Sequence, residues 1–194
     1  MNPPRFPDYT YLSDNVLYAL EFASVAHQTQ MRKGAQHIPY ISHPAMVGSI
    51  LARAGFPEET IIAGILHDVI EDTSYGYEYI AENFGKDIAG HVQCVSEDKS
   101  LNYITRKQLY LENLKNAPDD ALAVSMADSM ANLMSICISA AKYDVTLDTT
   151  YKNICDSLIK YGKLKLEIVS ARLSHPLIAE WQKVIDRAIA TVER

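Results

Sequence analysis

The chain has 194 residues, of which 48% are hydrophobic and 22% are charged, and its net charge is −6 at neutral pH. These values are typical of one globular domain with a sizeable core, and they argue against a broad nucleic-acid-binding surface. The three cysteines have no ligand-like spacing, so we expect reduced thiols in a cytoplasmic protein. Residues 1–11 lack an apolar signal core, and no stretch approaches the ~18 uncharged apolar residues of a membrane span, so no membrane contact is expected.

Helical periodicity runs through almost the whole chain. The first predicted helix begins at Ser13 or Asp14 and ends near Met31, because apolar residues recur there with a 3.6-residue period. A loop over residues 32–42 follows it. Further helices are predicted over residues 44–54, 57–72, 75–83, 86–95, 103–116, 118–141, 147–171 and 176–192. Since no run of alternating β-branched residues indicates a strand, the sequence predicts an all-α fold, a single domain of about eight to nine helices.

The segment His67–Thr73 places one histidine and three carboxylates in otherwise apolar surroundings. Burying such charge is unfavourable unless a partner compensates it, and a divalent metal is a suitable partner. On a helix His67 and Glu71 lie four residues apart, as do Asp68 and Asp72, so all four occupy one end of one face. Imidazole and carboxylate ligands favour Mn²⁺, Fe²⁺, Co²⁺ or Zn²⁺ over Ca²⁺. Glu71 and Asp72 are therefore candidates to move protons for a water molecule that the metal activates.

Two further residues complete a candidate ligand set. His43 stands at the start of a predicted helix, and Asp128 is the only acid in the uncharged run 121–141, so it needs a partner if it is buried. Taken singly, each residue has a simpler explanation: a helix-start histidine, an acid paired with an arginine, or a partly solvated helix end. Together His43, His67, Asp68 and Asp128 form an N2O2 set, which leaves positions for water and substrate on an octahedral ion.

These motifs resemble those of the HD-domain metal-dependent phosphohydrolases. The likeness is closer still to the hydrolase domain of RelA/SpoT-type alarmone enzymes and their small single-domain relatives. It runs from about His27 to Ser135, and the matching segments are residues 26–27, 32–34, 39–41, 43–44, 66–73, 83–85, 88–89, 125–128 and 132. The resemblance implies one HD-type domain, with a motif-bearing core over about residues 13–141 and divergent C-terminal helices over residues 146–194.

The resemblance also implies a reaction. The four-residue ligand set would hold Mn²⁺, or another divalent transition metal in its place. Glu71 and Asp72 would orient or deprotonate the attacking water and help to protonate the departing 3′-oxygen. The reaction would remove the 3′-pyrophosphate from guanosine tetraphosphate or pentaphosphate (ppGpp or pppGpp) and leave GDP or GTP.

Four other positions match substrate-contacting positions of the family. By this likeness Arg32 would pack on the purine, and Lys33 would lie beside the nucleotide or its phosphates, in keeping with a planar guanidinium and a point-like ammonium. Asn132 and Ser135, one and nearly two turns after Asp128, would contact the sugar or the base. The simpler alternatives are a solvated pair of loop charges and two polar residues in a helix–helix contact.

The last motif departs from the family pattern, since Ser129 and Met134 stand where basic residues are usual, and the region after Ala141 has only a vague likeness. Base and phosphate specificity therefore stay open. The alternatives are another phosphorylated nucleotide, such as NADPH or the product of a toxic synthetase, and a non-catalytic nucleotide-binding HD protein. The non-catalytic alternative predicts the loss of a ligand or an acid, and none is lost. The expected partner is a small nucleotide, and the sequence indicates neither a protein partner nor an oligomeric state.

Overall fold

In a computed structural model of the chain we describe residues 13–32, 38–142 and 149–193. Apart from an isolated antiparallel bridge between Met31 and Pro39, the regular secondary structure of these residues is helical, with turns and short loops between the helices. The helices are α1 (Asp14–Ala26), α2 (Ser42–Arg53), α3 (Glu58–Leu66), α4 (Val69–Asp72), α5 (Tyr77–Phe84), α6 (Lys86–Val95), α7 (Tyr103–Asn116), α8 (Asp119–Lys142), α9 (Thr149–Ser170) and α10 (Leu177–Val192). The predicted all-α fold is confirmed.

The helix boundaries follow local signals in most places. Ser13 caps α1 by accepting the Val16 amide at 3.2 Å, and α7 has the predicted bounds. Two predictions need correction. The first helix ends at Ala26 rather than Met31, because the next residues turn toward α4, where the Gln30 side chain donates to the backbone carbonyl of Asp72 at 2.6 Å. The helix predicted over residues 57–72 consists of α3 and α4, which brings the helices in the described ranges to ten.

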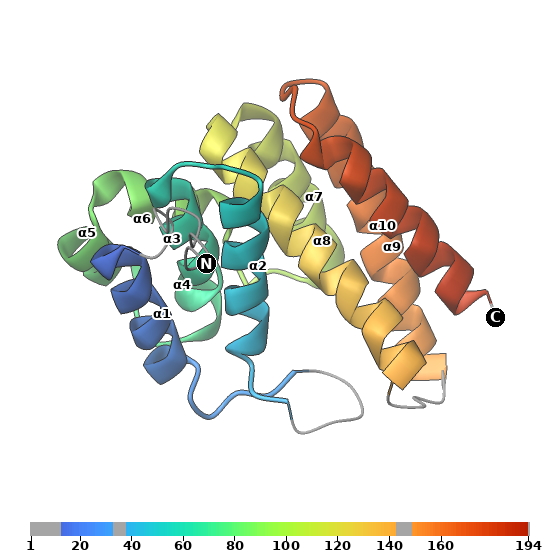
Figure 1. The fold of residues 1–194 in the computed structure, drawn as a ribbon, viewed down its shortest axis with the longest axis horizontal. Coiled ribbons are helices and arrows are strands. Elements are labelled where there is room, and N and C mark those ends of the chain that lie inside the picture. Colours follow the sequence, from blue (N-terminus) through green and yellow to red (C-terminus); the bar gives the residue numbers. More distant parts are fainter. Residues whose placement is uncertain (1–12, 33–37, 143–148, 194) are drawn as a thin grey trace, which may run out of the picture.

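The long helix α8 lies at the centre of the core. It packs against α2, α3, α6, α9 and α10, and Figure 1 shows α9 and α10 on one side of it and α2, α3 and α6 on the other. Residues 121–127 of α8 are completely buried, which places Asp128 directly after the most enclosed part of the helix. The division between a core over residues 13–141 and a C-terminal segment from 146 stays a prediction, and its boundary lies outside the described residues.

Helix α8 also corrects the expectation that no segment approaches a membrane span. Within the described ranges it is the one helix that is long and apolar enough by length and composition, over Asp119–Ala141 with a hydropathy of 1.5. However, 72% of this window is buried inside the protein. A core helix passes the same test, and α8 is a core helix here.

Two glycines bring the candidate ligands of α2 and α3 close together. A Cβ atom at Gly48 would lie 2.6 Å from Cγ1 of Ile65, and a Cβ at Gly64 would overlap with the side chain of Leu51. The missing side chains thus allow a close approach of the two helices. As a result, the start of α2, which carries His43, lies near the end of α3, where His67 follows.

Candidate active site

The junction between α3 and α4 carries the two ligand candidates that are adjacent in sequence. His67 and Asp68 lie between the two helices, with Asp68 at φ −94° and ψ −4°. Nδ1 of His67 lies 2.7 Å from the carbonyl oxygen of Gly64, which would accept the Asp68 amide in a continuous helix. The side chain therefore competes with the backbone for this acceptor. The break brings Oδ2 of Asp68 within 2.9 Å of Nε2 of His67.

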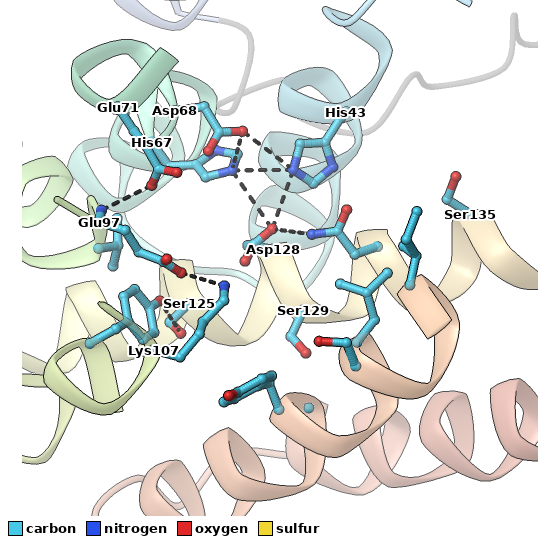
Figure 2. Close-up of a pocket in the computed structure, with 18 of the residues that line it drawn as sticks. His43, His67, Asp68, Glu71, Glu97, Lys107, Ser125, Asp128, Ser129 and Ser135 are labelled. Atoms are coloured by element: carbon cyan, nitrogen blue, oxygen red, sulfur yellow. Dashed lines mark hydrogen bonds and ion pairs between the residues drawn. The ribbon is translucent and has the colours of Figure 1, made fainter. Parts of the chain in front are cut away.

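The four predicted ligands meet at one point, although they come from three separate parts of the chain. Nε2 of His43 lies 3.2 Å from Nε2 of His67 and 3.3 Å from Oδ1 of Asp128. Oδ2 of Asp68 lies 3.6 Å from Nε2 of His43, and Oδ1 of Asp128 lies 3.8 Å from Nε2 of His67. Figure 2 shows the two imidazoles between the two carboxylates. Both histidines are buried, at 4% and 3% exposure.

This donor set fits a divalent metal ion. Because only an N–H group can donate to the Gly64 carbonyl, Nδ1 of His67 carries a proton, and in the neutral ring Nε2 keeps its lone pair toward the cluster. Ligands at right angles on an ion with bonds of about 2.1 Å lie about 3 Å apart, close to the distances here. The donor atoms of His43, His67 and Asp128 all lie within 4.8 Å of one another. Asp68 is outside this mutually close set, although its Oδ2 approaches both imidazoles.

The electrostatics of the site favour positive charge. Burial lowers the pKa of His43, which keeps that ring neutral. Burial opposes charge on His67 as well, but the adjacent Asp68 carboxylate raises the pKa of His67 to about 9. Although burial acts against it, His67 in turn holds the pKa of Asp68 well below its usual range. Burial acts to raise the pKa of Asp128, but Lys165 and, after it, His43 hold this pKa well below its usual range. The site therefore contains two carboxylates that stay ionised and attract a cation.

The two predicted catalytic acids lie on α4, beside the ligand cluster. Glu71 accepts the backbone amide of Glu97 at 2.9 Å, and Lys99 lies 3.5 Å from Oε1 of Glu71. Lys99 also forms an ion pair with Asp72. Burial raises the pKa of Glu71, so this carboxyl holds a proton more readily than an exposed glutamate. Both acids line the same cavity as the four ligand candidates, with a volume of about 1010 Å³.

Three of the four predicted substrate residues, Arg32, Asn132 and Ser135, line this cavity too. Arg32 donates to Oδ1 of Asn132 at 2.9 Å, and Asn132 donates through Nδ2 to Oδ1 of Asp128 at 2.6 Å. Asn132 thus links the predicted purine-binding arginine to a ligand candidate. Ser135 lines the cavity further along α8, away from the cluster (Figure 2). Lys33 lies outside the described residues, so its predicted role stays a prediction.

The structure adds polar residues that sequence reasoning did not assign to the site. Tyr40 donates its hydroxyl to Oδ2 of Asp68 at 2.7 Å, and Lys165 of α9 donates to Oδ2 of Asp128 at 3.2 Å. Glu97 binds Nε of Arg106 at 2.6 Å and Nζ of Lys107 at 2.5 Å, also at the cavity wall. Tyr40 stands inside a matching motif and could have been found there. Lys165 lies in the divergent segment, which gave no signal.

Two histidines and two aspartates meet at the core of an all-α domain, and two further acids lie one turn away. This arrangement defines the class of HD-domain metal-dependent hydrolases. The family model described as HD domain matches residues 19–154, and the chain belongs to this family, in its RelA/SpoT-type branch. The predicted family is therefore confirmed.

The relatives narrow the class further. The chain is 36% identical over 129 residues to the Drosophila melanogaster guanosine-3′,5′-bis(diphosphate) 3′-pyrophosphohydrolase MESH1, covering 66% of this chain and 72% of that protein. It is 34% identical over 123 residues to MESH1 of Homo sapiens, covering 62% and 69%. A solved structure is titled as a metazoan ortholog of SpoT that hydrolyses ppGpp and plays a role in starvation responses. It matches with a TM-score of 0.78 and 28% identity, over 94% of this chain and 99% of that one.

Proposed function

We propose that this protein is a Mn²⁺-dependent hydrolase that removes the 3′-pyrophosphate of guanosine tetraphosphate or pentaphosphate, giving GDP or GTP. The observation that carries the proposal is the convergence of His43, His67, Asp68 and Asp128 in a cavity that Glu71 also lines. The relatives with the printed activity of guanosine-3′,5′-bis(diphosphate) 3′-pyrophosphohydrolase support the choice of substrate.

Mn²⁺ suits the mixed imidazole and carboxylate donors of this site. When bound, such an ion polarises a phosphoryl oxygen and makes water a stronger acid, so that water can attack at neutral pH. The four side chains would hold the ion as two carboxylates and two neutral imidazoles, and the ion would take the place of the second proton that the Asp68 carboxylate favours on His67. The two imidazoles are buried and the two aspartate side chains are 16% and 19% exposed, which limits the access of bulk water and strengthens electrostatic interactions in the site.

Glu71 is our candidate for the group that takes the proton from the attacking water. Its carboxyl lies on the cavity wall, and its raised pKa brings it closer to the operating pH, as a general base requires. Asp72 forms an ion pair with Lys99, so in this arrangement its carboxylate would orient the attacking water and would not exchange protons with it. Glu71 in its protonated form would then return the proton to the departing 3′-oxygen.

The cavity has room and charge for a nucleotide that carries two oligophosphate groups, one on the 3′-oxygen and one on the 5′-oxygen. Its volume of about 1010 Å³ is at the upper end for small-molecule sites. The cations that line it can neutralise phosphates, and Arg32 has the planar group that stacks on a base. These cations are Arg32, Lys99, Arg106 and Lys107, whereas Lys165 also lines the cavity but forms an ion pair with Asp128.

The test is turnover of guanosine tetraphosphate with added Mn²⁺, following pyrophosphate and GDP, with NADPH in a parallel reaction. We expect pyrophosphate and GDP in equal amounts. Phosphate release from NADPH alone would keep the hydrolytic chemistry and overturn the proposed substrate. No product from either nucleotide, in protein that retains its metal, would overturn the proposed reaction.

A further inference from the structure

Lys165 makes an ion pair inside the candidate active site that neither the sequence nor the proposed reaction accounts for. It lies on α9, and its side chain is 12% exposed. Its Nζ lies 3.2 Å from Oδ2 of Asp128 and 4.8 Å from the centre of the Tyr110 ring. A lysine so far from solvent needs a strong partner, and the Asp128 carboxylate provides one.

The two oxygens of Asp128 have different partners. Oδ1 faces Nε2 of His43 at 3.3 Å and Nε2 of His67 at 3.8 Å, and it accepts Nδ2 of Asn132. Oδ2 is the oxygen that binds Lys165. Only Oδ1 therefore lies with the other donor atoms (Figure 2). The ammonium group fixes the rotation of the carboxylate.

We propose that Lys165 is a positioning residue that keeps Oδ2 of Asp128 away from the metal, so that Asp128 binds the ion through Oδ1 alone. A carboxylate without such a partner can bind a metal through both oxygens. The second oxygen would then fill a coordination position that water or substrate needs. This inference rests on the proposed function only in that a divalent metal occupies the site.

The packing around α9 holds Lys165 in this place. A Cβ atom at Gly162, one turn earlier, would lie 3.3 Å from both Oγ of Ser129 and Cδ1 of Leu133. The absence of a side chain at Gly162 thus lets α9 approach α8 closely at the level of Asp128. On the other side Tyr110 is fixed by a hydrogen bond of 2.8 Å between its hydroxyl and Ser125. The lysine is confined between α7, α8 and α9.

The experiment compares Lys165→Met and Lys165→Arg with Lys163→Met, which makes the same charge change at an exposed position of α9. Each protein is loaded with Co²⁺, and its visible absorption and its Co²⁺ affinity are measured without substrate. In Lys165→Met we expect weaker absorption bands than in the wild type, because a higher coordination number of Co²⁺ weakens them. The Co²⁺ affinity should stay within about threefold of the wild-type value, whereas a disrupted ligand environment typically weakens metal binding by about 10–100-fold. Lys165→Arg, which can still donate to Oδ2, should restore the wild-type spectrum.

Turnover provides the second measurement. In Lys165→Met we expect kcat to fall about tenfold or more while KM changes by less than about twofold, because transition-state rather than substrate binding is affected. A rise in KM with unchanged kcat would overturn the inference and make Lys165 a substrate contact. If Lys165→Met fails to fold, Lys165→Gln takes its place, with an intermediate spectrum expected. An unchanged Co²⁺ spectrum in the neutral variant would also overturn the inference, whichever nucleotide the enzyme hydrolyses.

Discussion

The hydroxyl of Tyr40 offers a sharp test of how the ligand carboxylates are held. Tyr40 donates to Oδ2 of Asp68 at 2.7 Å, and this is the oxygen that faces both imidazoles. Burial and then the Asp68 charge raise the pKa of Tyr40 above its usual value, so the hydroxyl keeps its proton and remains a donor over the whole working range of pH. Tyr40→Phe removes this donor alone and leaves the ring in place.

The magnitude follows from the kind of bond that is lost. A hydrogen bond to a charged group contributes about 1.5–3 kcal/mol, which corresponds to roughly 10- to 150-fold in a binding constant. Loss of a group that orients a metal ligand typically weakens metal binding by about 10–100-fold. The two estimates agree, so we expect Tyr40→Phe to bind Mn²⁺ about 10–100-fold more weakly. At saturating Mn²⁺ the rate should recover, since the ligands themselves are intact.

The assay is titration calorimetry with Mn²⁺, together with turnover as a function of Mn²⁺ concentration. The control is Tyr79→Phe, which removes a hydroxyl from a tyrosine that is 36% exposed and packs on Phe22 rather than on a ligand. This control should bind Mn²⁺ as the wild type does. Equal Mn²⁺ affinity in Tyr40→Phe and wild type would refute the reasoning that this hydroxyl positions Asp68.

Three further predictions concern the acid on α4 and the packing beneath the site. Glu71→Gln should retain metal but slow hydrolysis by roughly 10²-fold or more, as loss of a proton-transfer group implies; single-turnover rates in metal-loaded protein check this, and an unchanged rate removes Glu71 from the mechanism. Burial raises the pKa of Glu71 above its ordinary value of 4.5, and a general base must be ionised to accept a proton. Activity should therefore fall as the pH drops through a value above 4.5. A pH profile of kcat/KM whose acidic limb lies at or below 4.5 contradicts this. Gly64→Ala should lower the free energy of unfolding by about 1–3 kcal/mol, because the new methyl group overlaps with Leu51. Gly90→Ala, with nothing within 4 Å, is its control in chemical denaturation, and equal stability of the two variants would refute the packing argument.

Sequence reasoning identified the fold class and the ligand candidates because their signals are local. The string from His67 to Thr73 combines ligand types with apolar neighbours, and Asp128 is conspicuous as the one acid of an uncharged run. The structure brings these residues together with His43, as predicted. Their roles as ligands, and those of Glu71 and Asp72 as catalytic acids, remain predictions.

The parts that the sequence did not predict depend on contacts between distant segments. The break between α3 and α4 follows from the competition of the His67 ring for the Gly64 carbonyl, which helical periodicity does not register. Lys165 reaches Asp128 where α9 approaches α8 closely, and Gly162, which has no side chain to separate the two helices, lies at that approach. No motif in the divergent C-terminal segment marks that approach.

The most direct test of the central claim is Mn²⁺-dependent hydrolysis of guanosine tetraphosphate by wild-type protein and Asp68→Asn, with bound metal measured in the same samples. The site geometry predicts that chelation abolishes wild-type pyrophosphate release and that added Mn²⁺ restores it. It also predicts that Asp68→Asn loses metal and turnover together. Full hydrolysis by metal-free protein, or by Asp68→Asn, would contradict a metal site built from these four side chains.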